Sequence, residues 1–341
     1  MTTVCGSIAI PVEARPAGTQ AEKTSAMAAS EKARVKDDFI AGRNARVYRC
    51  RQRPPSRGST TGCSVSVDTD LRAEIARRVR LLVANEKFID ELWSVARELF
   101  MPDHPWFKGI VEHRWTREQI ALGEIQHYLR VRTNPIFFGY IVTNVASERN
   151  YALMDIVMEN FMEELGGEKT HVDIMLQMLD EAGIARDQAD QADPAPGTLA
   201  AIEMIRSGCQ NRSALEGISL LAFVEAMHGG PDGAAARVYK ELTGHYGFSR
   251  RAAATYELHA EQDTGHGDRQ IAAIREYATT DEVREKCRRA VHLGVEAFNF
   301  EWDGHVQAMT GQRDVYWSGK TGRLALRHPE VRLPKERLAQ V

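Results

Sequence analysis

Three side chains of the kinds that bind metal ions occur together in the segment YELHAEQDTGH, in the C-terminal third of the chain. His259, Asp263 and His266 are spaced four and three residues apart. In an α-helix these spacings place side chains on one face, with neighbouring Cβ atoms about 5–6 Å apart. Two imidazoles and a carboxylate on one face predict part of a metal site. Taken alone, however, the segment fits a solvated helix face better, because it carries several other charged residues.

A second pair of candidate ligands lies earlier in the chain. Glu164 and His171 are seven residues apart, which is about two helical turns, so they share a face if the glycines between them do not redirect the chain. Glu168 competes for the same role, because Glu168 and His171 form the Glu-x-x-His motif of ferritin-like di-iron bundles. The alternative is a cluster of acidic residues at an exposed helix end.

The third candidate is Glu225, at the end of the apolar run LLAFVEAM. A buried carboxylate is costly unless it is paired or binds a metal. Alternatively Glu225 reaches solvent at the edge of the run, since two glycines follow shortly afterwards. Together the three segments supply three imidazoles, three carboxylates and no cysteine. Such a set favours two iron or manganese ions over a single zinc ion.

The elements that would carry these residues are all helices. Apolar residues recur at helical spacing from Asp68 to Leu99, and Thr116 with Gln119 forms a capping box that opens a helix ending near Arg132. The polar stretch from Arg186 to Gly197 contains two prolines and predicts a surface loop. Further helices are predicted over residues 137–145, 149–162, 171–179, 199–205, 214–227, 234–242, 249–277 and 282–309. With no convincing strand pattern, the prediction is an all-α bundle of about seven to nine helices.

Composition limits the class of protein. The 341 residues are 43% hydrophobic with a formal net charge of −3, which allows a substantial core and gives no electrostatic reason to expect nucleic acid as a partner. Five scattered cysteines without a C-x-x-C pair argue against a disulfide framework or an iron–sulfur cluster, and favour a reduced, cytoplasmic setting. We find neither a membrane-spanning run of about 18 apolar residues nor a secretory signal.

The two ends of the chain differ from the middle. Residues 1–68 lack sustained periodicity and are rich in basic and small residues, which predicts a poorly ordered extension rather than a nucleic-acid or partner-binding arm. Residues 312–341 form an irregular basic tail. The helical domain is therefore predicted over residues 69–311.

The order Glu-x6-His, a lone Glu, then His-x3-Asp-x2-His resembles the haem-oxygenase-like di-iron oxidases and oxygenases. The resemblance covers roughly residues 70–310 and implies the helical fold shared with haem oxygenase, thiaminase II and the pyrroloquinoline-quinone synthase. It implies two Fe(II) ions that activate O2 through a peroxide-bridged species. The metal ligands that it implies are Glu164, His171, Glu225, His259, Asp263 and His266. The last helix of such sites tends to order around metal, and the glycines on either side of His266 are compatible with that behaviour.

The resemblance also bounds the reaction. Of the oxidations that the resemblance implies, the prediction is N-oxygenation of a small amine or an amino-acid-derived substrate in natural-product biosynthesis, with an electron donor for turnover. The alternatives are oxidative C–C cleavage or decarboxylation of an amino or fatty acid at the same site, a metal-free thiaminase-like hydrolase using Cys209, and a ligand-binding bundle. A homodimer is compatible with the sequence.

Several other polar residues are candidates for substrate contacts or for structural roles. Some could contact an amino-acid-like substrate, although surface or core roles are more common for each of them: His127, Tyr128, Arg130, Arg132 and Tyr256. Other histidines have no carboxylate partner at a suitable spacing and are expected to be structural or exposed: His104, His113, His228, His245, His292, His305 and His328.

Overall fold

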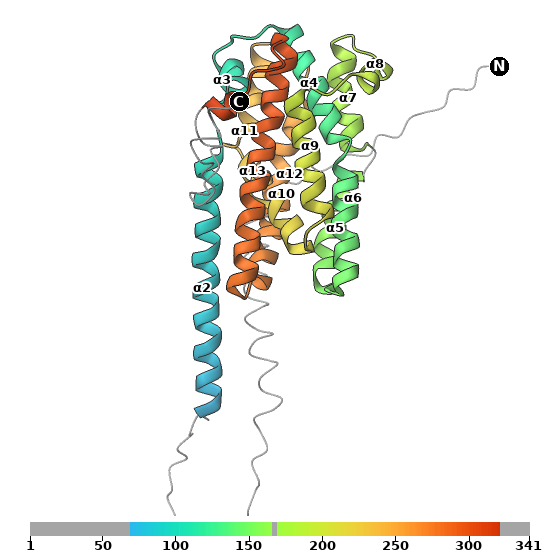
Figure 1. Ribbon diagram of the computed structural model, residues 1–341. Helices are drawn as coiled ribbons and strands as arrows, with labels where there is room; N and C mark the ends of the chain where they lie inside the picture. Colours follow the sequence, from blue (N-terminus) through green and yellow to red (C-terminus); the bar gives the residue numbers. More distant parts are fainter. Residues whose placement is uncertain (1–68, 102, 166–168, 321–341) are drawn as a thin grey trace, which may run out of the picture. The chain divides into compact units, whose positions relative to one another are not determined.

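The computed structural model describes residues 69–101, 103–165 and 169–320; for residues 69–82, 262–264, 319 and 320 it describes the backbone only. Within these ranges the chain forms helices and loops without a strand, as Figure 1 shows, which confirms the all-α prediction. None of the helices in these ranges is long and apolar enough to cross a membrane. The predicted N-terminal extension, and the tail beyond residue 320, lie outside the described residues.

The helices follow one another with short connections. In chain order they are α2 (Thr69–Leu99), α3 (Pro105–Val111), α4 (Arg117–Val131), α5 (Asn134–Glu148), the 3-10 helix η1 (Tyr151–Leu153), α6 (Met154–Leu165), α7 (His171–Glu181), α8 (Arg186–Gln191), α9 (Pro196–Gln210), α10 (Ala214–His228), α11 (Ala234–Gly244), α12 (Ala254–Tyr277), α13 (Asp281–Thr310) and α14 (Trp317–Lys320). The capping box predicted from Thr116 and Gln119 is present at the start of α4.

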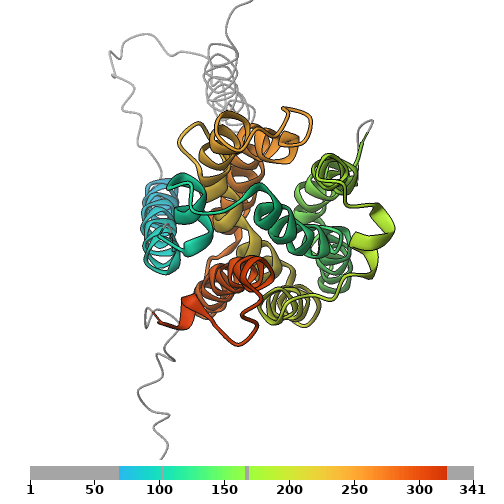
Figure 2. The ribbon, with the colours of Figure 1, turned by 90° about the horizontal axis from the view of Figure 1, so that it is seen from above.

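Helix α10 lies at the centre of the bundle. Its residues from Ala214 to Val224 are all buried, as expected for a helix that is apolar on every face. It packs against α5, α9, α12 and α13, which Figure 2 shows around it. A Cβ atom on Gly294 would lie only 1.9 Å from the Leu220 carbonyl oxygen, so α13 approaches α10 this closely only with glycine at that position.

Three segments differ from the sequence-based expectation. The predicted loop from Arg186 contains α8, whose Gln188 side chain accepts a hydrogen bond from the Ala185 N–H and whose Ala189 is buried. Helix α9 begins at Pro196 rather than near residue 199, because proline fits the first helical turn.

The third difference is α14, in the segment predicted to be irregular. The backbone N–H groups of Trp317 and Ser318 donate to Oδ1 of Asp303, 2.8 and 3.3 Å away, and the His104 ring nitrogen lies 3.1 Å from the same oxygen. Since Asp303 and His104 are fully buried, these contacts anchor α14 to α13. His104 therefore has the structural role that was expected.

Candidate active site

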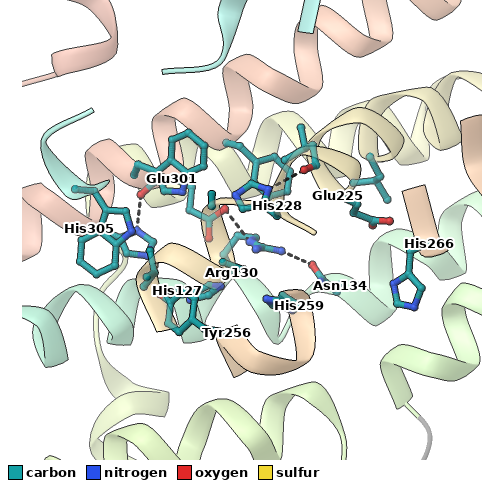
Figure 3. A pocket seen from close by; sticks show the side chains of 18 of the residues that line it. His127, Arg130, Asn134, Glu225, His228, Tyr256, His259, His266, Glu301 and His305 are labelled. Atoms are coloured by element: carbon teal, nitrogen blue, oxygen red, sulfur yellow. Dashed lines mark hydrogen bonds and ion pairs between the residues drawn. The ribbon is translucent and has the colours of Figure 1, made fainter. Parts of the chain in front are cut away.

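Most of the residues that were predicted to form the site line one cavity in the bundle. The space within its walls, counted together with its opening to solvent, is about 830 Å³. Figure 3 shows Glu225 and His266 toward one end and Glu301 and His305 toward the other. Aromatic rings contribute much of the wall, among them those of Trp106, Phe107, Phe137, Phe138, Phe298 and Trp302.

Five of the six predicted metal ligands lie at or beside the first of these ends. Glu164 from α6, Glu225 from α10, and His259 and His266 from α12 all line the cavity. His171 is buried beside them, with Nδ1 3.1 Å from Glu164 Oε2 and its ring centroid 5.5 Å from that of His259. The side chain of Asp263, and the whole of Glu168, lie outside the described residues. The six-ligand assignment therefore stays a prediction.

Some of these groups are occupied by other partners. His266 Nε2 lies 2.6 Å from Oε2 of Glu163, and Gln270 donates a 2.6 Å hydrogen bond to Glu225 Oε2. Among the side chains that the structure describes, no three of the metal-binding types stand close enough together to hold an ion. Metal binding at this end would thus require His266 and Glu225 to exchange these partners for the ion.

The electrostatics of this end suit a cation. Burial, reinforced by the nearby Glu164 carboxylate, raises the pKa of Glu225 to about 8. Burial, together with the neighbouring His171 and His127, holds the pKa of His259 well below its usual value. His171 Nδ1 is buried without a hydrogen bond despite its short distance to Glu164. A divalent ion would offset the repulsion between the two carboxylates and would accept the lone pairs of the imidazoles. Oxygen and imidazole nitrogen are donors that iron binds, so these residues fit iron.

Local features of the sequence hold these ligands in place. Helix α7 starts at His171 because Thr170 and Asp173 form a capping box, which fixes the imidazole in the first turn. Helix α12 crosses α10 at Gly267, where a Cβ atom would lie 2.6 Å from the Ala226 Cβ. The residues adjacent to this contact are His266 and Glu225. The glycine that was interpreted as allowing helix mobility therefore also permits the close crossing of the two ligand-bearing helices.

The sequence is similar to those of known proteins. Residues 124–298 match the family described as iron-containing redox enzymes, a span that includes all six predicted ligands. The chain belongs to this family. It is 24% identical to the 4-aminobenzoate synthase of Nitrosomonas europaea, over 63% of this chain and 89% of the relative. The corresponding values for the 4-aminobenzoate synthase of Chlamydia muridarum are 22%, 59% and 84%.

A solved structure agrees with the fold. A domain of unknown function with a heme oxygenase-like fold from Shewanella denitrificans superposes with a TM-score of 0.53 at 14% identity, covering 67% of this chain and 95% of that one. The predicted haem-oxygenase-like fold and family resemblance are thereby confirmed. The chain is an oxidoreductase of the iron-containing redox enzyme family.

The opposite end of the cavity contains polar residues whose placement the sequence did not reveal. His228 and His305 were expected to be structural or exposed, yet both line the cavity of this iron-containing redox enzyme. Each Nδ1 donates a 2.7 Å hydrogen bond to the carbonyl oxygen four residues earlier, and burial lowers the pKa of both rings to about 4. The i−4 backbone bond explains why no carboxylate partner was visible in the sequence.

The five candidate substrate contacts divide into two groups. His127, Arg130 and Tyr256 line the cavity. Tyr128 instead donates a 2.6 Å hydrogen bond to Asp190 of α8, and Arg132 pairs with the same carboxylate at 3.2 Å.

Behind the cavity wall, Glu124 is fully buried and joins two of the lining residues. It accepts a hydrogen bond from the Tyr256 hydroxyl at 2.5 Å, and its other oxygen lies 3.1 Å from Nδ1 of His127. A spacing of three residues links Glu124 to His127 in the sequence, but Tyr256 is 132 positions away. The first contact could have been inferred from helical spacing, whereas the second required the fold.

The hydrolase alternative finds no support at Cys209. Its side chain is fully buried and does not line the cavity. Burial, with the nearby Glu225 carboxylate, raises the pKa of the thiol to about 12. Since the thiolate is the nucleophilic form of cysteine, Cys209 is unsuited to catalysis.

Proposed function

We propose that this protein is a non-haem di-iron oxygenase that uses O2 to oxidise a nitrogen of a small amine or an amino-acid-derived substrate. The proposed ligands are Glu164, His171, Glu225, His259, Asp263 and His266. The observation that carries the proposal is the convergence of carboxylates from α6 and α10 with imidazoles from α7 and α12 at one end of a single cavity. Bound iron would supply the binding and reduction of O2.

The chain's own residues prepare that end for a metal. His259 is neutral in the folded protein, so its ring nitrogen offers a lone pair without first losing a proton. Contacts with His171 and Asn134 overcome the effect of burial and lower the pKa of Glu164, which keeps this carboxylate charged. The aromatic wall limits the entry of water around the reacting groups.

The choice of nitrogen chemistry rests on the lining and on the relatives. The name 4-aminobenzoate synthase describes proteins whose product carries an amino group. The charged side chains of Arg130 and Glu301 in the cavity favour a small polar substrate over a fatty acid. Inserting one oxygen atom of O2 into an N–H bond reduces the other to water, which consumes two protons and two electrons. We therefore include an external electron donor in the proposal.

Iron quantitation after anaerobic loading with Fe(II) tests the metal site. We expect about two iron ions per chain, and at most half of that in the double variant His259→Ala/His266→Ala. The matched control is His245→Ala, because His245 is exposed and stacks on His113 away from the cavity. Iron content near background, or content unchanged in the double variant, would refute the di-iron site.

Product analysis tests the reaction. The iron-loaded protein, O2 and a reductant are incubated with a panel of amines and amino acids, and products are measured by mass spectrometry. A gain of one oxygen on nitrogen is expected. Loss of carbon dioxide without such a product would instead support C–C cleavage by the same site.

A further inference from the structure

The buried ion pair of Arg130 and Glu301 is incompletely satisfied. Nε of Arg130 on α4 lies 2.9 Å from Oε2 of Glu301 on α13, and the two residues are only 7% and 1% exposed. Both atoms are nevertheless buried without a hydrogen bond of acceptable geometry. Buried polar atoms are nearly always satisfied in folded proteins, and an exception calls for an explanation, such as a role in function. This pair faces the cavity, as Figure 3 shows.

Aromatic rings and two histidines surround the pair. The Arg130 guanidinium lies over the Phe298 ring, 4.9 Å from its centroid, and Phe107 meets Trp302 edge to face at 4.5 Å. His228 and His305 lie at the same end, and burial lowers the pKa of each to about 4, so both are neutral near pH 7. The ion pair thus lies among aromatic rings and uncharged imidazoles.

Asn134 connects this pair to the predicted metal end. Its carbonyl oxygen accepts a 2.8 Å hydrogen bond from Nη1 of Arg130, and its amide nitrogen donates to Oε2 of Glu164 at 3.2 Å. A group held at Arg130 is therefore separated from a predicted metal ligand by one amide side chain.

Charge balance limits what can bind there. A substrate with only a carboxylate would draw Arg130 away and leave Glu301 as an unpaired buried charge. A substrate with only an ammonium group would draw Glu301 away and leave Arg130 unpaired. Unpaired buried charges are strongly unfavourable. A molecule that carries both groups leaves neither side chain without a counter-charge.

We propose that Arg130 and Glu301 bind the carboxylate and the ammonium group of a small α-amino acid, with its side chain against the aromatic wall. This inference rests on the proposed function and names the substrate class of the same cavity.

The test uses three probes that differ only in the head group. L-phenylalanine carries both charges, phenethylamine lacks the carboxylate, and 3-phenylpropanoate lacks the ammonium group. Binding to the full-length, metal-free protein is measured by calorimetry at pH 7. We expect L-phenylalanine to bind about tenfold or more tightly than either analogue, because each analogue leaves one buried charge unpaired.

Two variants make the test specific. Glu301→Gln should shift the preference toward 3-phenylpropanoate, since Arg130 then lacks its own anion and the carboxylate of the probe supplies one, and Arg130→Met should shift it toward phenethylamine. The exposed pair on α9 supplies the control, with Arg206→Met leaving the preference unchanged. If the ion pair has only a structural role, the two substitutions should weaken the binding of all three probes equally and leave their order of affinity unchanged.

Several outcomes would overturn the proposal. They are equal affinity for the three probes, no binding of any of them, and variants that keep the wild-type preference. Iron content is measured on the same preparations. A chain that binds iron but shows no head-group preference refutes the zwitterion site alone, whereas a chain that shows the preference without binding iron refutes the di-iron function.

Discussion

The crossing of α10 and α12 leads to a sharp prediction about Gly267. A Cβ atom at this position would lie 2.6 Å from the Cβ of Ala226 and 2.8 Å from its backbone nitrogen. Gly265 lies two residues earlier on α12, and a Cβ there would meet only the end of the Arg269 side chain at 3.8 Å. The substitutions Gly267→Ala and Gly265→Ala therefore add the same methyl group to the same helix. At Gly267 the methyl group is crowded by α10, whereas at Gly265 it has room.

The two substitutions share one energetic effect and differ in another. Replacing glycine by alanine within a helix stabilises it by about 1 kcal/mol in both variants. Carbon atoms pack at about 3.5–4.0 Å, so the methyl group of Gly267→Ala must push α12 away from α10 by about 1 Å. Overpacking of this kind costs about 1–3 kcal/mol. The difference between the variants isolates that packing cost, because the helix-propensity gain cancels.

Urea denaturation of the two metal-free variants measures this difference directly. We expect Gly265→Ala to equal or exceed the wild type, and Gly267→Ala to fall about 1–3 kcal/mol below Gly265→Ala. Iron content should also fall in Gly267→Ala, because the displaced helices carry Glu225 and His266. Equal free energies of unfolding for the two variants would show that α10 and α12 do not cross at Gly267.

Two further predictions address the other end of the cavity and the rival chemistry. Burial lowers the pKa of His305 from 6.5 to about 4, so the unfolded chain binds a proton that the folded protein does not, and the free energy of unfolding should fall by up to about 3 kcal/mol as pH drops from 6.5 to 4. Denaturation of His305→Gln across this range should show a shallower fall, and an unchanged pH dependence would contradict the burial of a neutral ring. For Cys209→Ala we expect a loss of about 1–2 kcal/mol in stability from the buried thiol but unchanged iron content and product formation, whereas abolished turnover in a folded variant would revive a cysteine mechanism.

Local sequence patterns predicted the parts of the fold that depend on local contacts. The capping box of Thr116 and Gln119 located the start of α4, because both partners lie within one turn. The prolines near Pro196 were less informative, since proline both interrupts loops and begins helices, and here it begins α9. Glu225 illustrates the limit: at the end of an apolar run it could face solvent or the interior, and only the packing of α10 directs it into the cavity.

Contacts between distant residues could not be predicted in the same way. Arg130 and Glu301 come from α4 and α13, and no spacing rule relates residues so far apart. His228 and His305 satisfy one ring nitrogen on their own helix, which removes the carboxylate signature that would have drawn attention to them. The sequence thus identified candidate ligands on individual helices, while the polar residues of the opposite end required knowledge of which helices adjoin.

The two ends of the cavity differ in how their carboxylates are neutralised, and this difference matches the proposed metal at one end and the proposed substrate at the other. Among the described residues that line the cavity, Glu164, Glu225 and Glu301 are the carboxylates and Arg130 is the only arginine or lysine. Arg130 contacts Glu301, so that end is already neutral and can exchange its ion pair for a zwitterion. Glu225 accepts a hydrogen bond from the neutral Gln270 amide, and burial beside Glu164 raises its pKa to about 8. A positive charge would stabilise this end, and bound iron would provide it.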